Sequence, residues 1–507
     1  MKTLPKQPRL VSRVSSLLKR TATFPILLVM VSMLASCSQE PGGNGATGGS
    51  ESRVVQLGPE SDRSDLFLHD DHLVAESQGL TLTPGTIRKH PGNPILVKDK
   101  PWEVGNLNYT CVMQDREEGT YKMWYQVIRP KEGGGNESWC MYATSKDGFQ
   151  WEKPSLGIIE YQGSKENNIV LHEHEGIRGT PSYWVEKDYA DPDPERRYKM
   201  MLQSWDFRGR AAHMASSPDG INWTSSGYGN RVGPFDSQNI FFWDDRIGSF
   251  VGYFRSHEGG LRSISRATSP DGYHWSRPET VHTPDADDPS TWHLYTPGIF
   301  KYSKARNTYI MLQGGYDEVS YDMYGELGVS RDGINWHRFR QPFMGPSEKG
   351  KWDAGYIMPI PADATIGGKT AIFYHASTNP AHDLGGDRGM GVAFLDQGAF
   401  LGWKAESEGT LLTHHLRVRD SQSLFHLSAK ATNGSIRAEL LDDSGQVLDG
   451  FSRDDCEPIT GAGAGLIVHW KGQEDLKEHL RRGTVRLKLY LNKATVYGFK
   501  CLRPRRH

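Results

Sequence analysis

One heptapeptide pattern, Ser-x-Asp-Gly-x-x-Trp, constrains the fold of this chain more than any other feature. Its four copies are found at 145–151, 217–223, 269–275 and 330–336. Asp-Gly favours a two-residue hairpin turn, because a type I′ turn needs positive φ at both central positions. The Ser and Asp side chains can bond the turn backbone, and the Trp supplies a large apolar surface at the start of the outgoing strand. Four copies at intervals of 72, 52 and 61 residues predict a repeat architecture.

A second, aromatic-rich segment repeats around the heptapeptide and predicts a strand. It occurs five times: YKMWYQ at 121–126, YKMMLQ at 198–203, FVGYFR at 250–255, YIMLQG at 309–314 and AIFYHA at 371–376. An apolar strand precedes each copy, so every unit has four strands. Five such units of about 50–75 residues predict a five-bladed β-propeller over 101–405, with a stacked array of β-sandwiches as the alternative. In the fifth unit, which lacks the heptapeptide, we expect the last turn at 395–398 and a final strand ending near Trp403.

The segments on either side of these units complete an all-β prediction. The 56 Gly, 14 Trp and 21 Tyr residues and the scarcity of helix-period stretches favour strands and turns. Residues 53–100 are expected to lead in with strands and turns. Residues 410–503 alternate apolar and polar positions with a period of two, which predicts an antiparallel β-sandwich of jelly-roll type.

The N-terminus has the pattern of an export signal. A basic stretch precedes an apolar run at 24–34, which is too short to span a bilayer comfortably. LASC at 34–37 resembles a bacterial lipobox, so 1–37 is predicted to be a lipoprotein signal peptide with Cys37 as the lipidated residue. Residues 38–52 are then a flexible tether. The sequence predicts a bacterial cell-envelope protein anchored to a membrane by lipid, at the outer membrane or periplasmic face.

Four further cysteines and the charge balance limit other interpretations. Cys111 and Cys140 are expected on the first and third strands of one blade, ~9.6 Å apart, which is too far for a disulfide. A Cys456–Cys501 bridge stays open, and four free buried thiols are the default. The formal net charge of −2 gives no basis for nucleic-acid binding.

Propeller geometry predicts where a site would lie. The innermost strand of every blade lines the channel and begins at the same face, called here the channel mouth. The heptapeptide turns should lie at the opposite face and be structural. Residues early in the inner strands, or in the loops between second and third strands, should surround the mouth. The predicted substrate-binding residues are Arg178, Trp205, Gln238, Asn239, Arg255, His257, His293, Tyr295, Tyr356 and His375.

Mixtures of carboxylates, arginines and aromatic residues are typical of sugar sites, and glycoside hydrolysis needs two carboxylates. The four candidate catalytic residues are Asp236, Glu103, Glu258 and Asp353, with Asp236 and Glu103 as the first pair. The histidines near the mouth lack the spacing of metal ligands, so no metal or cofactor is expected. A structural Ca²⁺ ion in the channel stays open.

The lipobox, the five units, the heptapeptides and the trailing sandwich resemble the five-bladed glycoside hydrolases of families 43 and 32. These are the arabinanase, β-xylosidase and invertase group, and the similarity covers about 85 to 405. The resemblance implies a base or nucleophile in the first blade, an orienting Asp in the second and an acid in the third. The nearest counterparts here are Glu103, Thr180 and Asp236.

Several functions follow from this resemblance and from the departures from its pattern. The first is a surface-tethered enzyme that hydrolyses glycosidic bonds of a poly- or oligosaccharide at the channel mouth. The alternatives are a polysaccharide lyase that uses His and Tyr as acid and base, a non-catalytic glycan-binding lipoprotein, and a scaffold whose propeller binds protein. The sugar, the linkage and the oligomeric state do not follow from the sequence.

Overall fold

The computed structural model describes most of the chain beyond the N-terminal segment. The described residues are 53–57, 63–67, 69–130, 136–172, 182–206, 209–225, 232, 235–236, 238–380, 387–418, 424–473 and 483–502. They all belong to the compact unit Ser52–His507. The predicted signal peptide and Cys37 lie outside the described residues.

Within those residues the structure is all-β, with one short 3₁₀ helix, η1 (Pro194–Arg196). No helix in the described part of the chain has the length and apolar character needed to cross a membrane.

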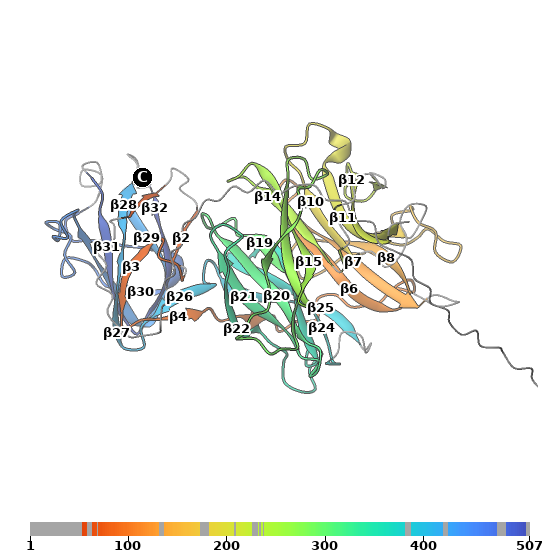
Figure 1. The fold of residues 1–507 in the computed structure, drawn as a ribbon. Coiled ribbons are helices and arrows are strands. Elements are labelled where there is room, and N and C mark those ends of the chain that lie inside the picture. Colours follow the sequence, from red (N-terminus) through yellow and green to blue (C-terminus); the bar gives the residue numbers. More distant parts are fainter. Residues whose placement is uncertain are drawn as a thin grey trace, which may run out of the picture. The chain divides into compact units, whose positions relative to one another are not determined.

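Five antiparallel sheets form the blades of a β-propeller, which confirms the predicted repeat architecture (Figure 1). Blade 1 consists of β6 (Asn106–Asp115), β7 (Thr120–Pro130), β8 (Asn136–Ser145) and β9 (Ile169–His172). Blade 2 consists of β10 (Tyr183–Lys187), β11 (Tyr198–Asp206), β12 (Gly209–Ser217) and β13 (Thr224–Ser225). Blade 3 consists of β14 (Ile240–Asp244), β15 (Ser249–Glu258), β16 (Leu261–Ser269) and β17 (Glu279–His282).

The last two blades vary this plan. Blade 4 consists of β18 (Trp292–Thr296), β20 (Tyr309–Asp317), β21 (Met323–Ser330) and β22 (His337–Met344), and β19 (Ile299–Lys301) also pairs with β20. Blade 5 consists of β23 (Tyr356–Ile366), β24 (Lys369–Ser377), β25 (Arg388–Asp396) and β5 (Arg88–Lys89). The outer strand of blade 5 therefore comes from the segment that precedes the propeller.

This closure corrects the expectation of a final strand near Trp403. Lys89 of β5 pairs with Ala393 of β25, and its ammonium lies 2.7 Å from Asp353 Oδ2. Trp403 instead belongs to β26 (Leu401–Lys404), which pairs with β4 (Thr81–Pro84) and β32 (Thr495–Leu502). A strand from the N-terminal side completes the last blade, so the ring is closed by backbone hydrogen bonds between distant parts of the chain.

The C-terminal residues and the rest of the leading segment form a separate sheet of nine strands. The order of its strands is β3 (Val74–Gln78), β27 (Glu408–Thr413), β31 (Arg486–Asn492), β29 (Leu424–Leu441), β32, β26 and β4. In addition, β2 (Asp65–Leu66) pairs with β32, and β30 (Ile459–Ile467) pairs with β29. A further parallel pair joins β1 (Val54–Leu57) to β28 (His415–Val418). Residues 53–100 are thus divided between this sheet and the propeller. The two-layered sandwich itself stays a prediction.

The heptapeptide turns differ from the predicted type I′ hairpin. Only the Gly of each copy has positive φ, for example +78° at Gly220, and the Asp does not. In the first copy Asp147 Oδ1 accepts the main-chain N–H groups of Phe149 and Gln150 at 2.8 and 2.9 Å. Ser145 Oγ accepts the Gly148 N–H at 2.8 Å. An Asp that bonds the amides after it behaves like an N-cap and keeps an ordinary φ, so the type I′ prediction was wrong.

The heptapeptide turns pack against the neighbouring blade. The indole N–H of Trp124, on β7, donates to the Gly220 carbonyl at 2.7 Å. Likewise Tyr253, on β15, donates to the Gly333 carbonyl at 2.8 Å. The Trp336 ring of the last copy lies 6.3 Å from the Tyr253 ring. Each of these turns is therefore fastened to the second strand of the preceding blade.

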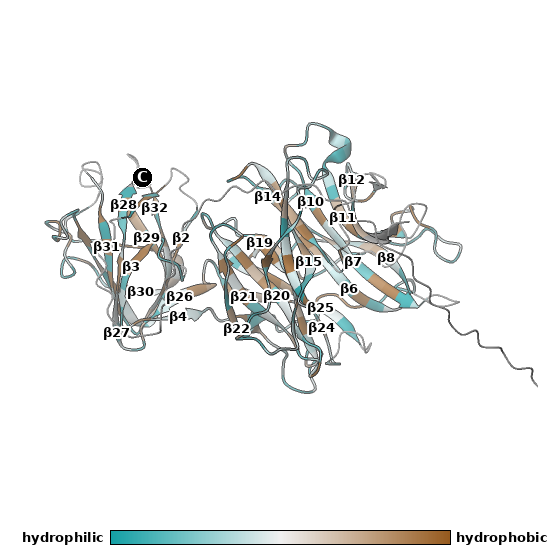
Figure 2. Cartoon of the chain, in the orientation of Figure 1, coloured by the Kyte–Doolittle hydropathy of each residue, from teal (hydrophilic) through white to brown (hydrophobic). Residues whose placement is uncertain are grey.

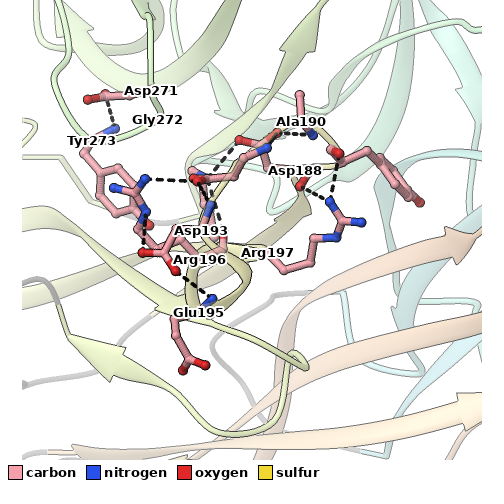
Figure 3. A network of polar contacts seen from close by, with 12 residues as sticks. Asp188, Ala190, Asp193, Glu195, Arg196, Arg197, Asp271, Gly272 and Tyr273 are labelled. Carbon is pink, nitrogen blue, oxygen red and sulfur yellow. Dashed lines mark hydrogen bonds and ion pairs between the residues drawn. The ribbon is translucent and has the colours of Figure 1, made fainter.

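The turns also lie at the predicted end of the propeller. In Figure 3, Arg196, from the connection between β10 and β11, lies beside Tyr273 of the third heptapeptide. Its guanidinium carbon is 5.9 Å from the centre of that ring. In blade 3, Arg246, from the connection between β14 and β15, donates to the Arg331 carbonyl of the fourth copy at 2.9 Å. Connections between first and second strands thus share one end with the heptapeptides, and the channel mouth is the other end.

Apolar side chains supply the core of both sheet systems. Figure 2 shows hydrophobic residues along the strands and hydrophilic residues in many of the connections. Cys111, Cys140, Cys456 and Cys501 are buried and free, as the default predicted. Burial raises the pKa of the Cys501 thiol to about 12, which favours the unreactive protonated form.

Candidate functional site

The side chains of blades 1, 3 and 4 meet at the channel mouth around Arg255. Its Nε donates to the Tyr295 carbonyl at 3.1 Å, and its Nη2 lies 3.5 Å from the Tyr109 hydroxyl. The hydroxyls of Tyr109 and Tyr295 are 3.2 Å apart. Because blades 1 and 4 are not neighbours in the ring, this contact crosses the channel. Two tyrosines and one guanidinium therefore close its centre.

Asp236 lies at the exposed edge of this arrangement. Its Oδ2 is 3.5 Å from Arg255 Nη1, and its side chain is 41 % exposed, whereas that of Arg255 is 3 % exposed. A buried cation thus supports a carboxylate that solvent or a ligand can reach. The positive charge of Arg255 stabilises a negative charge on Asp236.

A second carboxylate at the mouth is held by a buried histidine. His293 Nδ1 accepts the main-chain N–H of Arg262 at 3.0 Å, and its Nε2 lies 3.0 Å from Glu318 Oε2. Since Nδ1 is an acceptor, the neutral imidazole carries its proton on Nε2 and donates it to Glu318. The Glu318 side chain is 53 % exposed and that of His293 is 4 % exposed. The sequence did not single out Glu318 as a catalytic candidate, although it directly follows the second strand of blade 4.

His257 shares the electrostatic surroundings of both groups. Burial and the positive charges of Arg255 and Arg262 lower the pKa of His257, against the opposing effect of Asp236. His257 is therefore neutral at neutral pH and can accept a proton or a hydrogen bond. The name mouth cluster is used below for Arg255, His257, Arg262, His293, Asp236 and Glu318.

The structure does not bring Glu103 into the mouth cluster. Its Oε1 accepts the Tyr125 hydroxyl at 2.6 Å, and its Oε2 accepts the Asp99 N–H at 2.8 Å. Lys153 Nζ lies 2.8 Å from Oε1. Glu103 is buried, and each of these partners belongs to blade 1 or to the segment before it. Its carboxylate is engaged on both oxygens, which suits a structural ion pair.

Asp353 and Glu258 differ from Asp236 in the contacts that hold them. Asp353 is buried, and its Oδ2 meets Lys89 at 2.7 Å and the Tyr374 hydroxyl at 3.2 Å. It therefore ties β5 to blade 5. Glu258 is exposed at the end of β15, on the hairpin that leads to β16, so it stands at the mouth without a buried support.

The remaining predicted residues have positioning contacts or lie outside the described part. Gln238 Nε2 donates to the carbonyls of Thr110 and Tyr183, both at 2.9 Å, and so links blades 1 and 2. Asn239 Oδ1 accepts the Arg255 N–H at 3.1 Å. Tyr356 and His375 are buried in blade 5. The structure does not describe Arg178, Thr180 or the side chain of Trp205. Among the described residues, no group of three or more His, Cys, Asp or Glu is arranged to hold a metal ion.

A cavity of about 460 Å³ lies at the other end of the channel, near the ends of the inner strands. All five blades contribute to its wall, which includes Trp184, Glu186, Phe242, Phe300 and Asp363. Burial and the charge of Asp188 raise the pKa of Glu186 to about 8. Burial also raises the pKa of Asp363, whose Oδ2 is 3.0 Å from Arg116. Sequence reasoning missed this cavity, because its wall follows from the closure of the ring rather than from any local pattern.

The fold and this mouth define a five-bladed β-propeller with a polar, tyrosine-closed channel. No family model matches the chain, and no curated protein matches it. A solved structure described as a glycoside hydrolase is 18 % identical, covers 62 % of this chain and 92 % of its own, and has a TM-score of 0.42. The β-1,2-mannobiose phosphorylase from Listeria innocua is 13 % identical, with 61 % and 96 % covered and a TM-score of 0.45. A glycosyl hydrolase from Bacteroides ovatus is 15 % identical, with 61 % and 94 % covered and a TM-score of 0.42. Likeness at this level assigns no residue and no substrate to this chain.

Proposed function

We propose that the protein is a carbohydrate-active enzyme that cleaves glycosidic bonds of a poly- or oligosaccharide at the channel mouth. The observation that carries this proposal is the pair of partly exposed carboxylates, Asp236 and Glu318, each held by a buried basic side chain. Glycoside hydrolysis requires such a pair, one carboxylate acting as acid and the other as base or nucleophile.

The side chains that contact the two carboxylates suggest the roles of these carboxylates. Asp236 contacts a permanent cation, Arg255, whereas Glu318 contacts a neutral imidazole, that of His293. A fixed cation beside a carboxylate suits a base or nucleophile, whereas a neutral hydrogen-bond donor beside a carboxyl group suits an acid. We therefore assign Asp236 as the base or nucleophile and Glu318 as the general acid that protonates the leaving oxygen.

Buried tyrosines close the centre of the channel beneath the mouth residues, which supports this assignment. Tyr109, Tyr295 and Tyr356 pack together as a buried cluster. Their hydroxyls and ring edges offer hydrogen bonds and apolar contact of the kind that sugar rings use. The closed centre would hold a substrate at the mouth, beside the carboxylates.

The test is turnover of a defined panel of oligosaccharides by the purified chain, followed by reducing-end release and chromatography. We expect Asp236→Asn and Glu318→Gln each to lower the rate by about 10²- to 10⁴-fold, with an unchanged circular dichroism spectrum. Wild-type turnover in both variants would remove these residues from the mechanism. An unsaturated product would instead indicate elimination by a lyase.

Glycan binding without turnover is the second candidate function. It is supported by the engagement of Glu103 and Asp353 in buried ion pairs, because carboxylates held in this way are less free to take part in catalysis. Affinity for a glycan in the same panel, with no product after long incubation, would establish this function.

Anchoring to the cell envelope by a lipid on Cys37 is part of the same proposal. It is supported by the LASC sequence at 34–37 and by the tether-like composition that follows. Labelled fatty acid should be incorporated into the wild-type chain and not into Cys37→Ala. Equal labelling of both chains would contradict the anchor.

A further inference from the structure

Arg388, the first residue of β25, carries a buried charge that the described residues leave unpaired. Only 3 % of the residue is exposed. Its Nη1 donates to Asn108 Oδ1 at 2.8 Å, while Nε and Nη2 are buried and have no hydrogen-bond partner in the described part of the chain. The amide of Asn108 is neutral, so it orients the guanidinium without balancing its charge.

The other buried arginines in the described residues differ in this respect. Arg255 has the Asp236 carboxylate 3.5 Å away. Arg338 contacts the carboxylates of both Asp288 and Glu326. A buried cation without a partner costs several kcal/mol of folding free energy. No ion pair within the described residues therefore accounts for the buried charge of Arg388.

His375 is a second buried and unpartnered group with its charge state coupled to Arg388. It is 1 % exposed, and neither ring nitrogen has a hydrogen-bond partner within the described residues. Burial and the positive charge of Arg388 lower the pKa of His375 to about 3. The imidazole is thus neutral at neutral pH, with one N–H to donate and with a cation nearby that disfavours binding of a further cation.

The free atoms of Arg388 form one side of the guanidinium. The N–H bonds of Nε and Nη2 point in the same direction, so this edge matches the two oxygens of a carboxylate, sulfate or phosphate group. The edge belongs to the mouth end of blade 5, because Arg388 begins β25 and Tyr356 begins β23. The guanidinium carbon is 5.8 Å from the Tyr356 ring centre, and Asn108 lies near the start of β6.

We propose that the Nε–Nη2 edge of Arg388, with His375, binds an oxyanion carried by the substrate, so that the enzyme takes an acidic saccharide. The oxyanion is a carboxylate of a uronic acid or a sulfate ester. The inference that the oxyanion belongs to a saccharide rests on the proposed function, whereas oxyanion binding at Arg388 does not.

The test measures binding by calorimetry to the full chain at low salt. The probes are a neutral oligosaccharide, a uronate-containing and a sulfated oligosaccharide of the same length, and free phosphate and sulfate. We expect one acidic oligosaccharide to bind at least about 10-fold more tightly than the neutral one, as a charge-assisted bidentate pair requires. Arg388→Gln should abolish this difference, and Arg388→Lys should restore only part of it, because Lys keeps the charge and loses the two-pronged edge.

Thermal unfolding of the ligand-free proteins supplies an independent readout. Arg388→Gln removes an unpaired buried charge, so its Tm should equal or exceed that of the wild type. A clear fall in Tm would show that Arg388 stabilises the fold and would overturn the proposal.

The remaining outcomes are also decisive. Equal affinity of wild type for acidic and neutral oligosaccharides, with no Arg388-dependent binding of phosphate or sulfate, would overturn the oxyanion site. If only the free ions bind in an Arg388-dependent way, the oxyanion site would be supported, but the claim that a saccharide carries the oxyanion would be overturned. Arg388-dependent binding of acidic oligosaccharides without any turnover would support this inference while the proposed cleavage fails.

Discussion

Arg255 and Tyr295 are joined both by a hydrogen bond and by a stacked contact. Arg255 Nε donates to the Tyr295 carbonyl at 3.1 Å, and the guanidinium carbon lies 4.3 Å from the centre of the Tyr295 ring. The contact links the second strand of blade 3 to the inner strand of blade 4. The same guanidinium faces Asp236, so the geometry of the blades determines where this carboxylate stands.

Arg255→Lys should therefore separate geometry from charge. The ammonium keeps a positive charge near Asp236 but cannot contact Tyr295, Tyr109 and Asp236 at once. We expect kcat/KM to fall by about 10- to 100-fold, because a small displacement of a reacting group is costly. Steady-state kinetics on the best oligosaccharide measure this change. Unchanged kcat/KM in a folded Arg255→Lys variant would show that the contact does not position the site.

The heptapeptide glycines provide a test of the packing between blades. Gly220 has φ of +78°, and a Cβ there would lie 2.8 Å from Cζ2 of Trp124. Gly220→Ala should lower the unfolding free energy by about 2–4 kcal/mol, from the left-handed backbone and the clash together. Gly248 is the matched control, because its φ is +61° and a Cβ there would meet no atom within 4 Å. Gly248→Ala should cost only about 1 kcal/mol, and equal losses in urea unfolding would contradict the packing role.

Glu103 should matter for stability and not for chemistry. Glu103→Gln removes the buried carboxylate that pairs with Lys153 and leaves it only the exposed Asp99 carboxylate at 2.6 Å, so the unfolding free energy should fall by about 3 kcal/mol. The rate per folded molecule, measured well below the unfolding temperature, should stay close to that of the wild type. A stable Glu103→Gln protein that has lost turnover would return Glu103 to the catalytic set.

The cavity carboxyl Glu186 predicts a specific dependence of stability on pH. Its pKa is raised from 4.5 to about 8, so between these values the folded chain holds a proton that the unfolded chain has released. Its contribution to stability is complete below pH 4.5 and is lost as pH rises through 8. The stability of Glu186→Gln relative to that of the wild type should therefore increase with rising pH, by up to about 5 kcal/mol at pH 9. Urea unfolding over this range measures the difference, and a difference independent of pH would contradict the shifted pKa.

The blades were predictable because each is built from contacts within one short stretch of sequence. The aromatic strand recurs in every blade, so its five copies indicated five units, although the heptapeptide occurs in only four of them. The outer strand of blade 5 was not predictable in this way, because Arg88 and Lys89 form a two-residue strand whose partner lies about three hundred residues later. The turn type was missed because the Asp carboxylate bonds downstream amides, which a two-residue hairpin rule does not consider.

The candidate site was predictable in position more than in chemistry. The starts of the inner strands indicated His293 and Tyr295, and the connection after the second strand of blade 3 indicated Arg255, because strand ends follow from the repeat. The sequence could not show that Glu103 meets Lys153, since that ion pair depends on tertiary packing. It also gave no reason to choose Glu318, whose support is a histidine on the neighbouring strand. Partners across strands decide which carboxylates remain available.

The central claim is that Asp236 and Glu318 act together on one glycosidic bond. The most direct measurement is kcat for Asp236→Asn, Glu318→Gln and the double variant on the same oligosaccharide. Groups that serve one step have strongly non-additive effects, so the double variant should be no more than a few-fold slower than the slower single variant. Wild-type kcat in either single variant, or a double-variant loss equal to the product of the two single losses, would contradict the claim.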